Sequence, residues 1–207
     1  MTPRTDCLIT SAKSGLLFLS AREPESWGSD RVFCARTADG GVTFQFVSWV
    51  VSPSDPYRAV MPSTVRCAPG KFVAAIRRRD MNTPEGWIDA YGSVDGGASW
   101  SFLSKVGEAG GWNGNPPALA QLDDGRLCCV YGNRTRRQML ARFSRDGGRS
   151  WGTALVLRDD FRSIDDEPDF GYPRLVQRAD GCLVVLYYWA TEDHPQQHIA
   201  ATIWTPG

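Results

Sequence analysis

Aromatic and polar side chains gather near the expected ends of strands in this chain. They are Trp87, Trp112, Asn113, Asn115, Asp169 and Tyr172. A flat aromatic face beside hydrogen-bonding groups suits a sugar ring, because such a site needs both an apolar platform and polar groups that fix orientation. Ordinary packing of aromatic-rich strands is the alternative for at least half of them. The pattern predicts a carbohydrate site built from some of these residues.

Arginines at strand ends predict contact with an anion. Arg134 follows Asn133 at the end of an expected strand, where its planar guanidinium group can bind a carboxylate through two hydrogen bonds. The run Arg77-Arg78-Arg79 ends another expected strand, and alternation directs only some of the three, such as Arg77 and Arg79, to one face. A rim salt bridge is the alternative for Arg134, and a solvated strand end is the alternative for the run.

Three turns with one motif must position these residues. Residues 93–100 and 144–151 both read Ser-x-Asp-Gly-Gly-x-Ser-Trp, and residues 37–44 are a looser copy that ends in Phe44. The aspartate can accept hydrogen bonds from its own turn, and the glycines supply left-handed conformations. The closing aromatic ring is expected to swing back between strands and become buried. We therefore interpret Asp39, Asp95 and Asp146 as structural residues.

A second marker recurs at intervals of about 55 residues, at Gly15, Gly70, Gly125 and Gly181. Each glycine lies between two short apolar runs, which predicts a β-hairpin because tight hairpin turns need positive φ. A third strand is expected before each boxed motif, at 31–35, 88–91 and 140–143. A fourth is expected after each motif, at 45–50, 101–106 and 154–157. Four strands per repeat predict the blade of a β-propeller.

The predicted fold class is therefore an all-β propeller of four-stranded antiparallel blades. Residues 1–207 are expected to form one domain, with blade units at about 6–55, 56–110, 111–165 and 166–207. The last unit has three expected strands and no boxed motif. Four units are the low end of the propeller range of about four to eight blades, so we expect a partial or open propeller.

Composition narrows the classes of function. The 23 basic and 23 acidic residues balance, which argues against nucleic acid as a partner, and no long apolar run predicts a membrane span. The first residues show no secretory signal, so the chain as written is expected to be cytoplasmic, with the location of a longer parent protein left open. The six cysteines lie in apolar contexts without a C-x-x-C pair and are expected to be small buried residues. No metal or organic cofactor is implied.

These repeats resemble the sialidase (neuraminidase) superfamily, also called BNR-repeat proteins. Residues 115–127, 130–134 and 140–151 are similar to the blade that carries one of three arginines clamping the substrate carboxylate, with Arg134 at that place. Residues 171–187 are similar to the final sialidase blade, with Tyr172 at the place of the nucleophilic tyrosine. The Met61-Pro62-Ser63 segment, followed by the arginine run, resembles a third such blade.

The resemblance covers essentially the whole chain and implies a retaining exo-glycosidase that cleaves a terminal, acidic sugar of the sialic acid type. Such enzymes use a tyrosine nucleophile, an exception to the two-carboxylate rule. A neutral phenol is not repelled by the substrate carboxylate at the anomeric carbon. Sialidases have more blades, so the resemblance also implies a C-terminal portion or a naturally shortened relative that lacks roughly two of them.

The resemblance also suggests further site residues. Arg58 lies near the place of another sialidase arginine, and Arg174, two residues after Tyr172, is expected on the same side of its strand. Asp169 is our candidate for the general acid, with Asp55 and Asp89 as alternatives. Pro116 stands where sialidases carry the glutamate that partners the tyrosine, and Glu108 and Glu167 are loop candidates for that role.

Two classes of function follow. The leading one is a sialidase-like glycoside hydrolase whose partner is a carbohydrate or glycoconjugate. The alternative, favoured by Pro116, is a non-catalytic propeller that binds a glycan or a protein. A truncated inactive fragment is a third interpretation, in which open sheet edges would cause self-association because an unpaired strand templates pairing.

Overall fold

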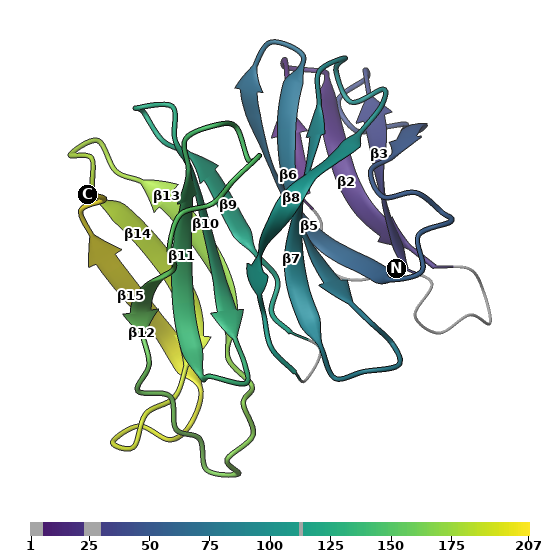
Figure 1. The fold of residues 1–207 in the computed structure, drawn as a ribbon. Coiled ribbons are helices and arrows are strands. Elements are labelled where there is room, and N and C mark those ends of the chain that lie inside the picture. Colours follow the sequence, from purple (N-terminus) through teal and green to yellow (C-terminus); the bar gives the residue numbers. More distant parts are fainter. Residues whose placement is uncertain (1–5, 23–29, 112–113) are drawn as a thin grey trace.

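The described chain consists of strands and connecting loops. The computed structural model describes residues 6–22, 30–111 and 114–207. Within these ranges the strands form four antiparallel sheets, and the sheets follow one another in space in the order of the sequence (Figure 1). None of the described residues forms a helix that could cross a membrane.

Each sheet is built from consecutive strands. The first contains β1 (Asp6–Ile9), β2 (Gly15–Ala21), β3 (Arg31–Thr37) and β4 (Gln45–Trp49). The second contains β5 (Arg58–Ala68), β6 (Lys71–Arg79), β7 (Gly86–Ser93) and β8 (Ser101–Glu108). The third contains β9 (Ala118–Gln121), β10 (Leu127–Asn133), β11 (Gln138–Ser144) and β12 (Leu155–Arg158). The fourth contains β13 (Gly171–Gln177), β14 (Leu183–Trp189) and β15 (His198–Trp204).

This arrangement confirms the predicted fold class of antiparallel blades. Three of the four hairpin glycines have the predicted positive φ, whereas Gly15 is the first residue of β2 and does not. Gly70, Gly125 and Gly181 have φ of 70°, 85° and 83°, a conformation that other residues adopt only with strain. The last sheet has three strands. Because every strand pairs with its neighbour along the chain, each sheet is a meander, and the first strands of successive sheets (β1, β5, β9 and β13) contact one another.

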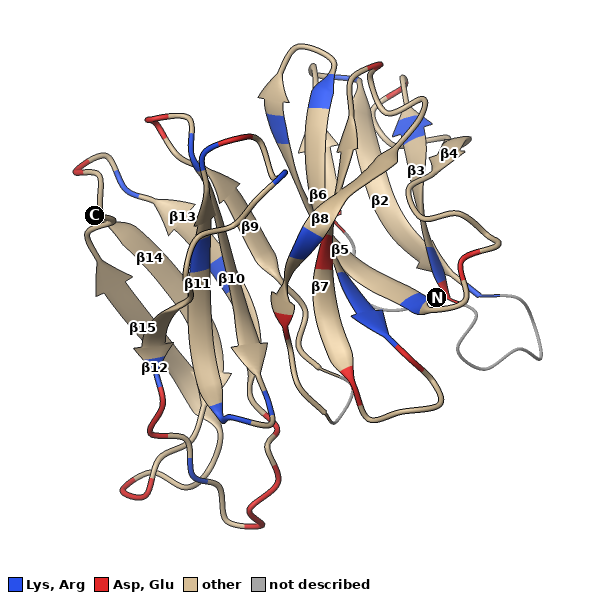
Figure 2. Ribbon diagram, viewed as in Figure 1, with Lys and Arg blue, Asp and Glu red and all other residues tan. Residues whose placement is uncertain are grey.

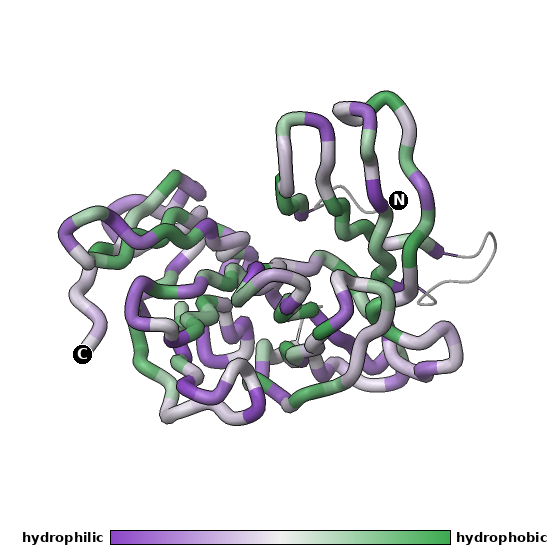
Figure 3. Tube along the Cα trace, turned by 90° about the horizontal axis from the view of Figure 1, so that it is seen from above, coloured by the Kyte–Doolittle hydropathy of each residue, from purple (hydrophilic) through white to green (hydrophobic). Residues whose placement is uncertain are grey.

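The core lies between the sheets and not within any one of them. Strand β6 shows why, because its side chains alternate between two apolar neighbours. Phe72 and Ile76 pack toward the first sheet, whereas Val73 packs toward the third. A further cluster around Trp189 joins the third sheet to the fourth. Seen from above, apolar segments run through the interior of the sheet stack (Figure 3). Charged residues lie mainly at the strand ends and in loops (Figure 2).

The boxed motifs are turns locked by their aspartates, as the sequence predicts. In the third copy, Asp146 Oδ1 accepts hydrogen bonds from the backbone N–H groups of Arg149 and Ser150 at 3.0 and 2.9 Å. The Ser150 hydroxyl donates to Oδ2 at 2.5 Å. Because the Ser150 side chain and these amides stabilise the carboxylate, the pKa of Asp146 falls from 3.8 to about 2. Asp39 and Asp95 have the same lowered pKa, with the hydroxyls of Thr43 and Ser99 as the largest causes.

These lowered pKa values predict acid-sensitive stability. The folded carboxylates stay ionised down to about pH 2, so their contribution is fully present above about pH 4 and is lost as the pH falls toward 2. The urea midpoint, followed by tryptophan fluorescence, should therefore drop between pH 4 and pH 2. Asp146→Asn should lower the midpoint at pH 7 and flatten this drop, whereas Asp193→Asn in an exposed loop should do neither. An unchanged pH dependence in Asp146→Asn would contradict the assignment.

Two of the three closing aromatic rings, Trp100 and Trp151, swing back against a neighbouring sheet as predicted, and both are half-buried. Trp100 packs edge-on against Phe18 of the first sheet at 5.8 Å between ring centroids and stacks on Phe72 at 6.4 Å. Trp151 packs against the cluster between the second and third sheets. Phe44 is 48% exposed, so the expected burial is wrong there. The tryptophans fill the space toward the preceding sheet, and Phe44 belongs to the first sheet of the described chain.

The two terminal sheets present apolar outer faces. In the first sheet Phe33, Phe46 and Trp49 contact one another, with Phe46 and Trp49 exposed. In the fourth sheet the exposed residues include Val176, Leu186 and Ile203. The predicted burial of the cysteines holds for Cys34, Cys128 and Cys129 and is wrong for Cys7, which is exposed, while Cys67 and Cys182 are half-buried. Cys7 differs because it lies on the short edge strand β1, next to solvent.

Candidate active site

An open cavity of about 640 Å³ lies where strands of the second, third and fourth sheets end. Its lining residues are Arg58, Met61, Arg77, Arg134, Asp169, Tyr172 and Tyr188. Five of these seven were candidates from the sequence, and they come from strands far apart in the chain. The fold brings them together because β5, β6, β10, β13 and β14 all reach the same end of the stack (Figure 1).

Three guanidinium groups give the cavity its positive charge. Arg77 is buried, and this burial lowers its pKa to about 10, since desolvation and the nearby charges of Arg134 and Arg58 both disfavour the cation. A hydrogen bond and charge interaction with Tyr172 partly offset these effects. The Arg77 Nη1 group also donates to Met61 Sδ at 3.4 Å. Even with a pKa of about 10, Arg77 remains charged at neutral pH.

The other two arginines are oriented by carboxylates. Arg58 Nε lies 2.7 Å from Oδ2 of Asp30, which is buried. Arg134 Nη2 lies 2.8 Å from Asp169 Oδ1. Each pairing uses part of a planar fork and holds its plane in one orientation. The guanidinium groups are therefore held in place before any ligand arrives.

Asp169 is hydrogen-bonded both to Arg134 and to a tyrosine, Tyr188, that lies beside Tyr172. The Tyr188 hydroxyl donates to Asp169 Oδ1 at 2.6 Å, and the Tyr188 ring lies 5.8 Å from the Tyr172 ring, centroid to centroid. Burial, followed by the hydrogen bond to Asp169, raises the pKa of Tyr188. Tyr188 therefore stays protonated and acts as a donor, whereas Tyr172 is 37% exposed and reaches the open cavity.

A buried amide fixes the backbone that presents Tyr172. Tyr172 has φ of 52°, a conformation that costs a residue with a side chain about 1–3 kcal/mol. The Tyr172 N–H donates to Asn115 Oδ1 at 3.1 Å, and Asn115 Nδ2 donates to the Phe170 carbonyl at 2.5 Å. Gly171 between them leaves no room for a side chain, because a Cβ there would lie 2.2 Å from the Asn115 amide. Asn115 thus hydrogen-bonds to the backbone on both sides of Gly171.

Met61 in the second sheet has a similar arrangement, a positive φ with its N–H bonded to a buried side-chain oxygen. Its φ is 55°, and its N–H donates to the hydroxyl of the buried Ser20 at 3.2 Å. Met61 and Tyr172 each precede a proline, and the strand register shifts at both places. Each bulge turns a side chain out of the regular alternation and toward the cavity. Two strained residues at one cavity are typical of a functional site.

Several candidates from the sequence lie elsewhere. Asn115 is fully buried, so the expected ligand contact is replaced by its hold on the backbone. Arg174 is exposed and pairs with Leu186, away from the cavity lining, because the register shift after Gly171 breaks the alternation with Tyr172. Arg79, the last residue of β6, also lies outside that lining. The candidates Trp112 and Asn113 lie outside the described residues.

The alternative acids, Asp55 and Asp89, belong to a different charged cluster, which is centred on Arg78. Both pair with Arg78, which is 1% exposed, at 2.5 and 3.5 Å. Burial raises the pKa of Asp89. Arg78 faces the first sheet because it alternates with Arg77, and its Nη1 also donates to Tyr91. Of the acids considered from the sequence, Asp169 is therefore the one that lines the cavity.

Sequence reasoning missed Tyr188. The repeat itself contains the missing signal, since Arg77, Gly132 and Tyr188 each lie seven residues after a hairpin glycine. The same position of the repeat therefore carries the guanidinium group of Arg77 in the second sheet and the phenol of Tyr188 in the fourth. In the third sheet it is Gly132, which leaves space for the Asn115 amide, since a Cβ there would lie 2.9 Å from that amide. Among the described residues, no group of three or more His, Cys, Asp or Glu side chains could hold a metal ion.

Comparison with known proteins assigns the family. Residues 4–185 match the BNR repeat-like domain. The chain belongs to this family. The BNR repeat-like assignment agrees with the boxed turns and the blade arrangement. No curated protein matches the chain.

Solved structures share the fold of this BNR repeat-like chain. A protein of unknown function from Dyadobacter fermentans is 25% identical with a TM-score of 0.71, over 92% of this chain and 50% of that one. The GH93 α-L-arabinofuranosidase of Fusarium graminearum, solved with arabinobiose, is 17% identical with a TM-score of 0.74, over 98% of this chain and 62% of that one. The Penicillium chrysogenum α-L-arabinanase with arabinobiose is 18% identical with a TM-score of 0.68, over 93% and 60%. The chain therefore spans less than two thirds of each.

Proposed function

We propose that this BNR repeat-like chain carries the site of an exo-glycosidase that removes a terminal acidic sugar, with Tyr172 as nucleophile. The observation that carries the proposal is the convergence of Arg58, Arg77 and Arg134 around the Tyr172 phenol in one open cavity. Guanidinium groups bind carboxylates through paired hydrogen bonds. A phenol beside them attacks without repelling the bound carboxylate.

The charge of the cavity distinguishes this proposal from the chemistry of the arabinose-bound structures. Arabinobiose, present in the Fusarium and Penicillium structures, is a neutral disaccharide. Among the described residues, three arginines face two carboxylates, Asp169 in the cavity lining and Asp30, which pairs with Arg58, so one positive charge remains in excess. Burying a net positive charge is unfavourable unless an anion pairs with it. The fold likeness supports a carbohydrate ligand, and the excess charge favours an acidic one.

The proposed reaction proceeds in two steps. The Tyr172 oxygen bonds to the anomeric carbon as the glycosidic C–O bond breaks, and the bonding pair leaves with the departing oxygen. Asp169 delivers a proton to that oxygen, and the phenol releases its proton to water, so atoms and charge balance. In the second step Asp169 takes a proton from the water whose oxygen bonds to the anomeric carbon, the bond to Tyr172 breaks, and the tyrosine oxygen regains a proton from solvent. The Arg77 hydrogen bond stabilises the tyrosine oxygen as it gains charge.

A panel of fluorogenic glycosides tests the proposal. We expect turnover of 4-methylumbelliferyl α-N-acetylneuraminide and none of the matching α-L-arabinofuranoside. Arg134→Lys should raise KM for the acidic substrate by roughly 10–100-fold, since a charged hydrogen-bond pair is lost. Arg66→Lys, on an exposed part of β5, is the matched control and should leave KM unchanged. Turnover of the neutral substrate alone would overturn the assignment of an acidic sugar.

A non-catalytic glycan-binding site is the second candidate. Two observations favour it. Pro116 is buried and offers no acid, and Asp169 already accepts hydrogen bonds from Arg134 and Tyr188. Calorimetric binding of N-acetylneuraminic acid without hydrolysis of any acidic glycoside in the panel would select this function.

A further inference from the structure

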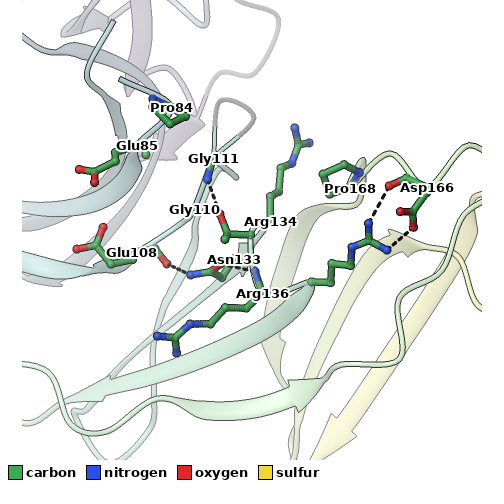
Figure 4. A pocket seen from close by; sticks show the side chains of 13 residues that line it. Pro84, Glu85, Glu108, Gly110, Gly111, Asn133, Arg134, Arg136, Asp166 and Pro168 are labelled. Atoms are coloured by element: carbon green, nitrogen blue, oxygen red, sulfur yellow. Dashed lines mark hydrogen bonds and ion pairs between the residues drawn. The ribbon is translucent and has the colours of Figure 1, made fainter. Parts of the chain in front are cut away.

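A second cavity of about 660 Å³ opens beside the first, among the loops of the second and third sheets (Figure 4). Residues 84–86 and 108–111 form one wall, and residues 133–137 and 166–168 form the other. Arg134 lines both cavities, so they meet at this side chain. We propose that the second cavity binds a neutral sugar unit, the part of the substrate beyond the bond that is cleaved. This inference rests on the proposed function and adds a second subsite to it.

Hydrogen bonds between the loops hold the walls of the second cavity in place. Asn133 Nδ2 donates to the Glu108 carbonyl at 2.9 Å, and the Gly111 N–H donates to Thr135 Oγ1 at 2.8 Å (Figure 4). The Arg134 N–H donates to the carbonyl of residue 109 at 3.0 Å. These bonds tie the end of β8 to the loop after β10. The groove is therefore formed before a ligand binds, as is usual for small-molecule sites.

The close approach of the two loops depends on Gly110. Its φ is 75°, and a Cβ there would lie 2.6 Å from the Thr135 backbone nitrogen. A residue with a side chain would push the walls apart. The neighbouring Gly111 differs, because a Cβ there would make only ordinary contacts, the nearest at 3.5 Å. A side chain added at Gly111 would therefore project into the groove without straining the backbone.

The charges of the second cavity balance, unlike those of the first. Its charged lining residues are Glu85, Glu108, Asp166, Arg134, Arg136 and Arg137. Arg137 pairs with Asp166 at 2.5 Å, and Glu108 pairs with Lys105 at 2.5 Å. A groove of mixed donors and acceptors without excess charge suits a hydroxyl-bearing neutral ring. The rings of Pro84 and Pro168 add apolar surface at the two walls (Figure 4).

The two cavities together predict that an acidic sugar binds more tightly when it is linked to neutral sugars. Each hydroxyl of the second unit that finds a hydrogen-bond partner should tighten binding by roughly 2- to 10-fold before the cost of ordering the ligand. We therefore expect the trisaccharide N-acetylneuraminyl-lactose to bind roughly tenfold more tightly than free N-acetylneuraminic acid. The difference should depend on the groove and not on Arg58 or Arg77, which line the first cavity alone.

Calorimetry on the full chain tests this inference, with Tyr172→Phe as background so that no ligand is consumed. Gly111→Tyr, which fills the groove, should lower the affinity for the trisaccharide to that for the monosaccharide and leave the monosaccharide affinity unchanged. Gly152→Tyr is the matched control, because a Cβ there also meets only ordinary contacts, and it lies beyond the boxed motif at the other end of β11. This control should change neither affinity.

The outcomes separate the inference from the proposed function. Equal trisaccharide affinity in Gly111→Tyr and its parent overturns the second subsite alone. Loss of both ligands in Gly111→Tyr, with a folded protein by circular dichroism, also overturns it, because the groove would then serve the acidic sugar itself. Failure of both ligands to bind the parent protein overturns the proposed function, and the inference with it.

Discussion

Replacing Tyr172 by phenylalanine should lower kcat on an acidic aryl glycoside by ~10³-fold or more, as expected when a nucleophilic atom is removed. The ring and its contact with Tyr188 remain, so KM should change little. The proposed contacts of Arg58, Arg77 and Arg134 with the substrate carboxylate should persist in this variant. Steady-state kinetics measure both constants, and mass spectrometry of acid-quenched enzyme should show a glycosyl adduct with the native chain and none with Tyr172→Phe.

The matched control for this variant is Tyr57→Phe. Tyr57 is also partly exposed and contacts the ring of Trp87 at 5.1 Å, outside the cavity. Its loss of a hydroxyl should leave kcat unchanged. If Tyr172→Phe retains full turnover, Tyr172 is not the nucleophile. If the unmodified chain binds the acidic sugar but does not hydrolyse the glycoside, the glycan-binding candidate is favoured.

The second large effect is expected at Asn115, through its hold on the backbone. Asn115→Ala leaves the Phe170 carbonyl and the Tyr172 N–H without their buried partner. Unsatisfied buried groups cost about 1–3 kcal/mol each, so the loss of two partners should lower the free energy of unfolding by about 2–6 kcal/mol. Urea denaturation measures this loss. Asn82→Ala, an exposed loop position, is the control and should leave the stability unchanged.

The kinetic consequence of Asn115→Ala separates positioning from stability. Below the unfolding transition, kcat should fall because Tyr172 relaxes from its positive φ and its phenol moves from the reacting position. KM should change less, since the proposed carboxylate contacts of the arginines do not involve Asn115. A parallel rise in KM with unchanged kcat would contradict this role. Asn115→Asp should not restore kcat, because a carboxylate cannot donate to the Phe170 carbonyl.

Local chemistry made the repeat predictable. The boxed turns need only an aspartate, hydroxyls and glycines within one segment, and the hydrogen bonds to the aspartate that lock each turn are local, such as Ser150 to Asp146. Alternation likewise separated Arg77 from Arg78, which face opposite neighbours. The predictions of burial failed where the packing of a neighbouring sheet determines whether a side chain is buried. Phe44 was expected to be buried, yet its exposure depends on what packs over the first sheet.

The candidate site could be predicted only in part. Arg134 and Tyr172 stand at conspicuous places near strand ends, and both line the cavity. Arg174 was misplaced because a bulge after Gly171 shifts the register, and a sequence pattern cannot count an extra residue in a strand. Asn115 was expected to contact ligand because its polarity is visible in the sequence, whereas its burial is not.

The sequence by itself determined that the chain repeats a blade, where the blades turn, and which residues carry guanidinium and phenol groups. Those features depend on local turn geometry and alternation, whose interactions span a few residues. Only the tertiary structure decided that Arg58, Arg77, Arg134, Asp169 and Tyr172 share one cavity. Their meeting depends on how separate sheets pack and where register shifts, through contacts such as Asn115 to Tyr172 that join segments far apart in the chain.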